Sequence, residues 1–311
     1  MKRLRAWALA TTAATYFLIF VGGFVRVSGA GLGCPDWPKC FDRWIPPTSV
    51  SQLPPEIDPS TFNVTLAWIE YINRLIGVAI GILILITTIL AFKYASRIPR
   101  ILYPTLAALV LVGIEGWQGS QVISSKLEPF IVTIHMVLAF LIVSALLYAT
   151  LQTHQMLAGP AARQPDTPRL RRWLAPLWLF AIIAIGLGTQ VRSEIEELVK
   201  QFPLEDSITL LGSLGPVHVW HLIVGGLIVI STWYIGARIL TQRDRLTSVS
   251  IHSTRVLMAV ALIQVVIGIV LVSLALPAFL QVFHLWFSSL YVGALLVLHF
   301  SLSHNEGIAN A

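Results

Sequence analysis

Four polar residues in apolar surroundings are the strongest candidates for chemistry in this sequence: Asn73, His135, His221 and His284. Each lies about two helical turns inside the outer end of a long apolar stretch that is expected to cross a membrane. Ionisable groups at this depth are costly and usually functional. Histidines at equal depth on facing helices are suitable axial ligands for a haem iron. We therefore predict haem ligation by the C-terminal histidine pair and a second, different site at Asn73 and His135.

A simpler interpretation is that these histidines only form hydrogen bonds between helices, as we would expect of a single buried histidine. Equal depth, and a related pair in the other half of the chain, favour ligation. Asparagine is a poor ligand for haem iron, so His135 alone would leave one iron position open or weakly held. A haem with two histidine ligands suits electron transfer, whereas an accessible iron suits oxygen chemistry. The alternative is that the N-terminal site has lost its metal role.

The composition indicates a membrane protein. Of the 311 residues, 56% are hydrophobic and only 12% are charged, which is more apolar surface than a soluble domain of this size can bury. We expect an all-α integral membrane protein. Apolar runs of sufficient length predict eight transmembrane helices, near residues 7–27, 66–92, 101–123, 129–152, 173–191, 214–240, 251–274 and 278–301.

The distribution of basic residues predicts the orientation. Fourteen of the 21 lysines and arginines precede the first span, or lie in or beside the loops after the second, fourth and sixth spans. The positive-inside rule then places both termini in the cytoplasm, as expected of a multi-pass protein of the cell inner (plasma) membrane. The net charge of +6 follows from this topology, and we see no nucleic-acid signal in it.

An internal repeat divides the chain into two halves of four helices. The segment that begins at Asn73 aligns with the one that begins at His221, and the segment that begins at His135 aligns with the one at His284. Three further pairs occupy matching positions: Glu115 and Gln264, Gly119 and Gly268, and Val25-Arg26 and Val191-Arg192.

A repeat with the same orientation in both halves implies a pseudo-two-fold axis along the membrane normal. We predict two pseudo-symmetric four-helix bundles, an N-terminal half at 1–152 and a C-terminal half at 173–311. A cytoplasmic linker at 153–172, rich in proline, arginine and glutamine, joins them.

Charged residues near the predicted sites are further candidates. Glu70 lies three residues before Asn73 on the same helix face, where it could transfer a proton or stabilise a carbocation. Alternatively, it is an interfacial acid paired with Arg74 or water. Arg26 and Arg192, just past the outer ends of their spans, suit haem propionates, although interfacial arginines also occur at such positions.

The only two cysteines, Cys34 and Cys40, lie in a long outer loop, residues 28–65. The outer side is oxidising, and a separation of six residues permits a small disulfide loop. Such a pair is either a structural staple or a redox-active site. A metal site is less suitable because no histidine lies nearby. The remaining histidines near the cytoplasmic side are expected at the surface: His154, His252, His299 and His304.

Two segments resemble the haem A synthase family (CtaA/Cox15): GGFVRVSGAGLGCPDWPKC, residues 22–40, and WIEYINR, residues 68–74. The repeat with its three histidines does so too, and the resemblance covers essentially the whole chain. It implies an oxidoreductase that converts the C8 methyl group of haem O to the formyl group of haem A by successive hydroxylations. It also implies haem b in the C-terminal half, haem O in the N-terminal half, a catalytic Glu70 and a Cys34–Cys40 disulfide.

The partners implied by the resemblance are haem O synthase upstream, haem-copper oxidase assembly downstream, and an electron donor that the sequence does not identify. This chain departs from the family at Asn73, where histidine is usual, so we predict that His135 holds the substrate iron alone. A non-enzymatic membrane b-type cytochrome or haem-binding assembly factor would need only His221 and His284. A transporter would explain the repeat but not the matched histidines.

Overall fold

The computed structural model describes residues 1–158, 171–202, 209, 212–274 and 276–303. Within these residues, eight helices are long and apolar enough to cross a membrane. The prediction of an all-α integral membrane protein is confirmed. The helices are α1 (Lys2–Val27), α2 (Val64–Ala95), α3 (Pro99–Ser124), α4 (Pro129–Ala158), α6 (Ala175–Gln201), α8 (Pro216–Leu240), α9 (Ser248–Ser273) and α10 (Ala278–Ser303).

Local sequence signals account for several of the helix starts. The side chain of Asn63 accepts a hydrogen bond from the backbone nitrogen of Leu66, 3.1 Å away, and so caps α2. Thr247 caps α9 in the same way. Proline is the first residue of α3, α4 and α8, where its missing N–H costs nothing.

Helix α6 ends ten residues later than the predicted limit of its span at residue 191. The extension is polar, and side chains one turn apart stabilise it: Arg192 pairs with Glu196 at 3.0 Å, and Gln201 donates to Glu197 at 3.0 Å. Hydropathy marks only the part of a helix that lies in hydrocarbon, so it underestimates this one. Helix α4 likewise continues to Ala158, into the predicted linker, of which residues 159–170 lie outside the described part.

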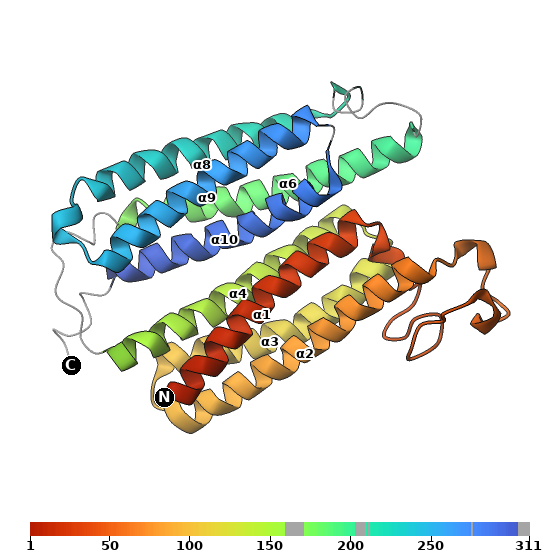
Figure 1. Cartoon of the computed structure of the whole chain (residues 1–311), viewed down its shortest axis with the longest axis horizontal. Coiled ribbons are helices and arrows are strands. Elements are labelled where there is room, and N and C mark those ends of the chain that lie inside the picture. Colours follow the sequence, from red (N-terminus) through yellow and green to blue (C-terminus); the bar gives the residue numbers. More distant parts are fainter. Residues whose placement is uncertain (159–170, 203–208, 210–211, 275, 304–311) are drawn as a thin grey trace.

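The arrangement of the helices places the outer loop far from the N-terminal end of α1. Helices α1 to α4 lie side by side, and α6, α8, α9 and α10 form the other half (Figure 1). Helix α1 begins, and α10 ends, at one end of the molecule, while the loop between α1 and α2 projects from the opposite end (Figure 1). The candidate residues of the sequence all lie toward that loop end of their helices.

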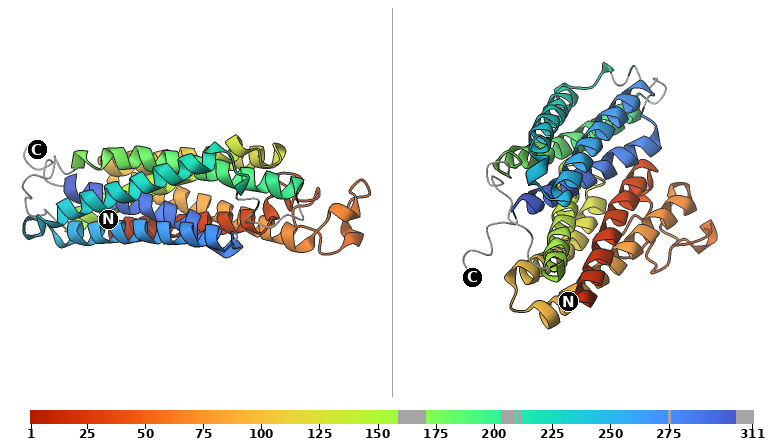
Figure 2. Two further views of the ribbon diagram at one scale, coloured as in Figure 1. Left: turned by 90° about the horizontal axis from the view of Figure 1, so that it is seen from above. Right: turned by 60° about the vertical axis from the view of Figure 1, so that its left-hand side comes forward.

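Buried apolar clusters form within each half. One cluster joins α6, α8, α9 and α10, and two smaller clusters join helices of α1 to α4. The halves meet where α1 packs on α10 and where α4 packs on α6 and α10 (Figure 2). The division into two separate bundles related by a pseudo-two-fold axis stays a prediction.

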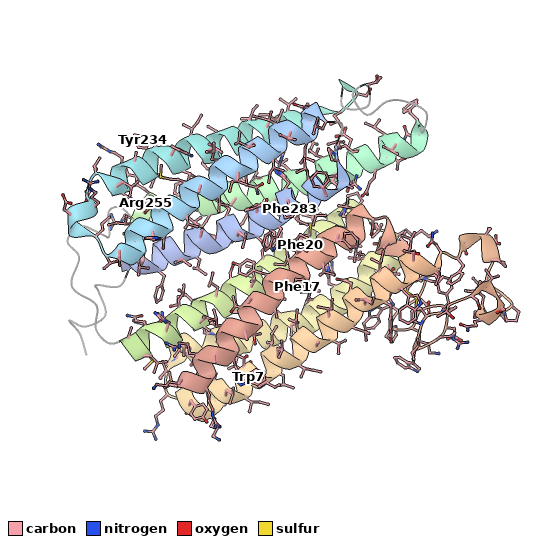
Figure 3. All side chains as sticks on the ribbon, in the orientation of Figure 1. Trp7, Phe17, Phe20, Tyr234, Arg255 and Phe283 are labelled. Atoms are coloured by element: carbon pink, nitrogen blue, oxygen red, sulfur yellow. A yellow bond between two sulfur atoms is a disulfide. The ribbon has the colours of Figure 1, made fainter. Side chains whose placement is uncertain are left out.

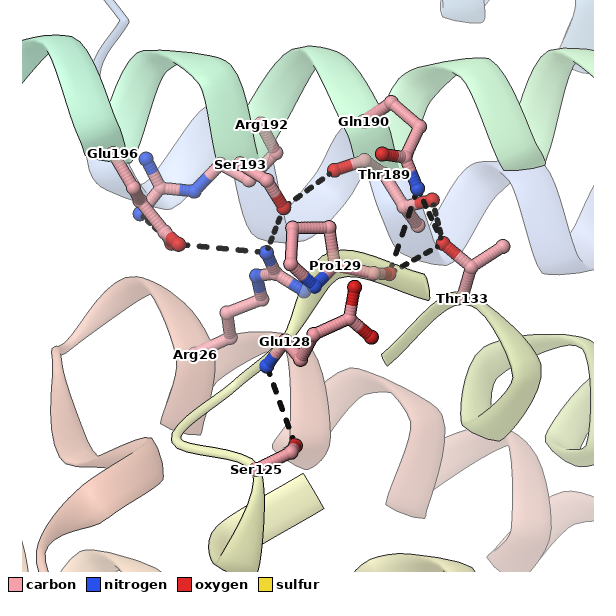
Figure 4. A network of polar contacts seen from close by, with 10 residues as sticks. All are labelled: Arg26, Ser125, Glu128, Pro129, Thr133, Thr189, Gln190, Arg192, Ser193 and Glu196. Atoms are coloured by element: carbon pink, nitrogen blue, oxygen red, sulfur yellow. Dashed lines mark hydrogen bonds and ion pairs between the residues drawn. The ribbon is translucent and has the colours of Figure 1, made fainter. Parts of the chain in front are cut away.

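The two junctions between the halves differ in chemistry. Under the repeat, α1 corresponds to α6 and α10 to α4, so the α1–α10 and α4–α6 contacts are equivalent. The first is aromatic: the ring centroid of Phe20 lies 5.7 Å from that of Phe283 (Figure 3) and 5.7 Å from that of Trp286. The second is polar: the hydroxyls of Thr133 and Thr189 are 2.6 Å apart (Figure 4). Polar pairs of this kind join helices where no hydrophobic effect acts between them.

Candidate functional site

The structure brings together the two histidines of the C-terminal half. His221 is the sixth residue of α8 and His284 the seventh of α10, so both lie about 10 Å along their helices. Their ring centroids are 6.3 Å apart and their planes are inclined by 71°. The two imidazoles therefore face each other at a similar depth.

Their spacing and surroundings fit a shared haem iron. Two nitrogen–metal bonds of about 2 Å each, plus about 1 Å from each nitrogen to the centre of its ring, separate the imidazole centroids by about 6 Å. The Nδ1 atom of His221 lies 3.1 Å from the carbonyl oxygen of Ala184. Because a carbonyl only accepts, this Nδ1 carries the hydrogen, and Nε2 keeps its lone pair for a metal. The Nδ1 of His284 is buried and has no hydrogen-bond partner among the described residues.

A glycine on α6 makes room for the His221 ring. A Cβ atom at Gly188 would lie 3.1 Å from Cε1 and 3.5 Å from Nδ1 of His221. The first distance is shorter than ordinary van der Waals contact, so the ring would have to move. At Gly186, one half-turn earlier on the same helix, an added Cβ would meet nothing within 4 Å.

Replacing Gly188 by alanine is expected to lower the affinity of the C-terminal half for haem roughly 10-fold, the lower limit for losing support of a metal ligand. The added methyl group displaces the imidazole and strains its hydrogen bond to Ala184. Haem titration of the purified variant measures the effect. The control is Gly186→Ala, which makes the same change of helix propensity without touching the ring. Equal haem affinity in the two variants would contradict the role given to Gly188.

The N-terminal half holds a different set of side chains. His135 is the seventh residue of α4, and its side chain is 37% exposed. Its Nδ1 lies 3.3 Å from Oε1 of Glu115 on α3, which is ion-pair distance, but the atoms are not aligned as a hydrogen bond. Asn73 is half-buried, and its Oδ1 is buried without a partner. No hydrogen bond joins Asn73 to His135 among the residues that the structure describes.

Glu70 and Arg74 fasten the outer loop to α2. Glu70 is only 4% exposed, and its carboxylate accepts hydrogen bonds from the backbone nitrogen of Cys34 (2.8 Å) and from Nε of Arg74 (3.1 Å). Arg74 also donates through Nη1 to the carbonyl oxygens of Asp36 (2.9 Å) and Lys39 (2.8 Å). The pairing with Arg74, one of the two sequence-based alternatives for Glu70, is present. A catalytic role for Glu70 stays a prediction.

The cysteine loop is closed and buried against the start of α2. Cys34 and Cys40 form a disulfide, and their exposed fractions are 0% and 1%. A Cβ atom at Gly33 would overlap the backbone of Leu66, so only glycine allows the loop to lie this close to the helix. Burial of both sulfur atoms favours the structural staple over the redox-active pair.

Arg26 and Arg192 converge on one carboxylate between the halves. Arg26 of α1 lies 3.5 Å from one oxygen of Glu196, and Arg192 lies 3.0 Å from the other (Figure 4). Arg26 also donates to the hydroxyl of Ser193 at 3.1 Å. Its Nε and Nη1 atoms are buried and have no partner among the described residues. Two cations for one anion leave positive charge and free donors, which suit an anionic group such as a propionate.

Sequence reasoning did not identify several polar residues at the junction of the halves. Thr133, Thr189, Ser193 and Glu196 form a network there with Gln190 (Figure 4). The sequence offers a signal for Glu196, which lies four residues after Arg192 and can therefore pair with it on one helix face.

Of the remaining histidines, His154 and His252 are exposed, as expected. The expectation of a surface position was wrong for His299, which is half-buried with Nδ1 buried, because it lies on the packed helix α10. His304 lies outside the described residues.

Fold and site together define a multi-pass membrane protein with paired histidines between its helices. Residues 5–296 match the family COX15-CtaA, whose description is cytochrome oxidase assembly protein. The chain belongs to this family.

Similar proteins align with this chain along most of their length, and their names fit the family. A protein of Shewanella oneidensis named "Heme A synthase" is 26% identical over 96% of this chain and 97% of its own. Proteins of the same name from Geobacillus kaustophilus and Sinorhizobium medicae are each 25% identical. The alignment with the Geobacillus protein covers 95% of this chain and 90% of that protein. The alignment with the Sinorhizobium protein covers 100% of this chain and 91% of that protein.

Proposed function

We propose that this chain is a haem A synthase, an oxidoreductase that converts the C8 methyl group of haem O to a formyl group by successive hydroxylations. The observation that carries the proposal is the pair His221 and His284, with ring centroids 6.3 Å apart. It occurs in a chain that is similar, over nearly its whole length, to proteins named "Heme A synthase".

In this proposal the C-terminal half holds haem b through His221 and His284. A haem with two histidine ligands supplies electron transfer. The hydrogen bond from His221 to Ala184 orients one ligand, and Gly188 leaves the space for it. Arg26 and Arg192 bind propionates at the junction of the halves, where Arg26 has buried donors without partners.

The N-terminal half binds the substrate, haem O, through His135. Asn73 leaves the other side of the iron accessible, which suits oxygen chemistry. Glu70 is the catalytic carboxylate in this proposal and exchanges a proton or stabilises positive charge near the reacting group. Its hydrogen bonds to Cys34 and Arg74 hold it in place, and the Cys34–Cys40 disulfide serves as a staple for the loop that supplies one of them.

The protein acts in the cell inner (plasma) membrane, with both termini in the cytoplasm. The uneven distribution of lysine and arginine supports this orientation. Haem O synthase supplies the substrate, and haem-copper oxidase assembly uses the product. The reaction also needs an electron donor.

Haem extraction and chromatography from cells that co-express this chain with a haem O synthase tests the proposal. The expected product is a formyl haem or its hydroxylated precursor. His135→Ala is expected to abolish the product, because in this proposal His135 is the ligand that holds the substrate iron. Asn73→Ala is expected to retain it, because an asparagine is not needed as a ligand.

The opposite result is that haem O accumulates unchanged and the purified protein binds only haem B. If the protein is folded and supplied with a reductant, this result would favour a membrane b-type cytochrome or a haem-binding assembly factor. Full activity of His135→Ala would refute the single-histidine substrate site even if formyl haem forms.

A further inference from the structure

The helix that precedes His135 and the helix that precedes His284 carry side chains in the same arrangement, with one difference. Glu115 on α3 and Gln264 on α9 each precede the corresponding histidine by twenty residues. One turn further along these helices, a Cβ at Gly119 would lie 3.8 Å from Cε1 of His135, and one at Gly268 would lie 3.7 Å from Cε1 of His284. The two histidine rings therefore lie against equivalent glycines, and the difference is an acid in place of an amide.

The amide of Gln264 does not serve the ring of its histidine. Its Nε2 donates to the backbone oxygen of His284 at 3.0 Å and to the hydroxyl of Ser288 at 2.5 Å. In the N-terminal half, Ala139 occupies the position of Ser288, and a carboxylate has no hydrogen to donate to a carbonyl. Glu115 therefore cannot repeat this arrangement.

Glu115 instead turns toward the imidazole. Its Oε1 is 3.3 Å from Nδ1 of His135. The other carboxylate oxygen and the Nδ1 atom are both buried without a hydrogen-bond partner among the described residues. Two unsatisfied polar groups this close in a low-dielectric interior are strongly favoured to pair.

We propose that Glu115 is a positioning residue that accepts the Nδ1 hydrogen of His135 and presents Nε2 to the substrate iron. This rests on the proposed function, in which His135 holds that iron. A carboxylate behind an imidazole fixes its ring orientation and makes it a more basic ligand. The inference gives the two halves different ligand strengths: a carboxylate supports the single histidine of the substrate site, and a carbonyl supports His221 in the electron-transfer site.

The test compares Glu115→Gln with wild-type full-length protein loaded with haem. Resonance Raman spectra of the reduced protein report the iron–histidine stretch of a haem with one histidine ligand, so the two-histidine site does not contribute. Glu115→Gln is expected to lower this frequency and to weaken haem binding at His135 roughly 10- to 100-fold. Glu115→Asp, which keeps the charge at a greater distance, is expected to give an intermediate frequency.

The matched control is Glu197→Gln on α6, the same chemical change at an exposed position, where the side chain accepts a hydrogen bond from Gln201. The low-spin spectrum of the His221–His284 haem reports folding in each sample. If Glu115→Gln lacks this signal, Glu115→Asp is used in its place. If wild type forms haem A but the Glu115 variants keep the wild-type iron–histidine frequency and haem affinity, the role of Glu115 is refuted and the proposed function stands. If wild type forms none, or if His135→Ala keeps the band, it is the proposed function that fails.

Discussion

Replacing Arg74 by alanine is expected to destabilise the protein by about 3–5 kcal/mol, the usual cost of removing one partner of a buried ion pair. Glu70, 4% exposed, would lose the guanidinium that stabilises its buried carboxylate. The carbonyl oxygens of Asp36 and Lys39 would lose their donor at the same time. Unfolding of the purified protein in detergent, followed by loss of helical signal, measures the effect.

The matched control for this prediction lies in the same loop. Lys39 and Asp42 form an ion pair at 2.7 Å, but their side chains are 39% and 78% exposed, so Lys39→Ala should cost at most about 1 kcal/mol. A double-mutant cycle with Glu70→Gln isolates the coupling between Glu70 and Arg74. If Arg74→Ala were no more damaging than Lys39→Ala, the loop would not be anchored in the way described.

If the C-terminal half holds haem as proposed, replacing His284 by alanine is expected to abolish that binding. Weakening the support of a metal-binding histidine already costs about 10- to 100-fold in metal affinity, and loss of the ligand itself costs more. The purified variant should lack a low-spin haem spectrum, and His221→Ala should behave identically because the two rings act as a pair.

The control is His252→Ala, an exposed histidine on α9. Total haem content, measured after extraction, and the low-spin spectrum report the result independently. A low-spin spectrum that survives in both His221→Ala and His284→Ala would mean that haem binds elsewhere or not through this pair.

The sequence is most informative where a property is local. Apolar runs predicted all eight spans, because the cost of burying polar groups in hydrocarbon depends on composition alone. The Cys34–Cys40 disulfide agrees with two cysteines six residues apart in a loop that is predicted to lie on the oxidising side. The equal offsets of His221 and His284 predicted that their rings would face each other, since a helix converts residue number into depth.

Features that depend on how distant helices pack were not predictable. Arg26 and Glu196 are separated by 170 positions, and they meet only because the end of α1 next to the 28–65 loop comes close to α6. Arg74 was considered only as a partner of Glu70, and its hydrogen bonds to the loop carbonyls depend on the fold of that loop. The direction of Glu115 likewise follows from the packing of α3 on α4, which a spacing of twenty residues does not reveal.

The contact between the first and last spans sets the order in which this protein can mature. The indole nitrogen of Trp286 on α10 donates to the backbone oxygen of Tyr16 on α1, 270 positions earlier. At a synthesis rate of about 5–20 residues per second, on the order of 14–54 s separate the emergence of these two residues from the ribosome. During that interval the aromatic face of α1 lacks the partners that α10 provides. The α4–α6 junction can form earlier, whereas the α1–α10 junction can close only after translation has delivered α10, so the two junctions between the halves form at different times.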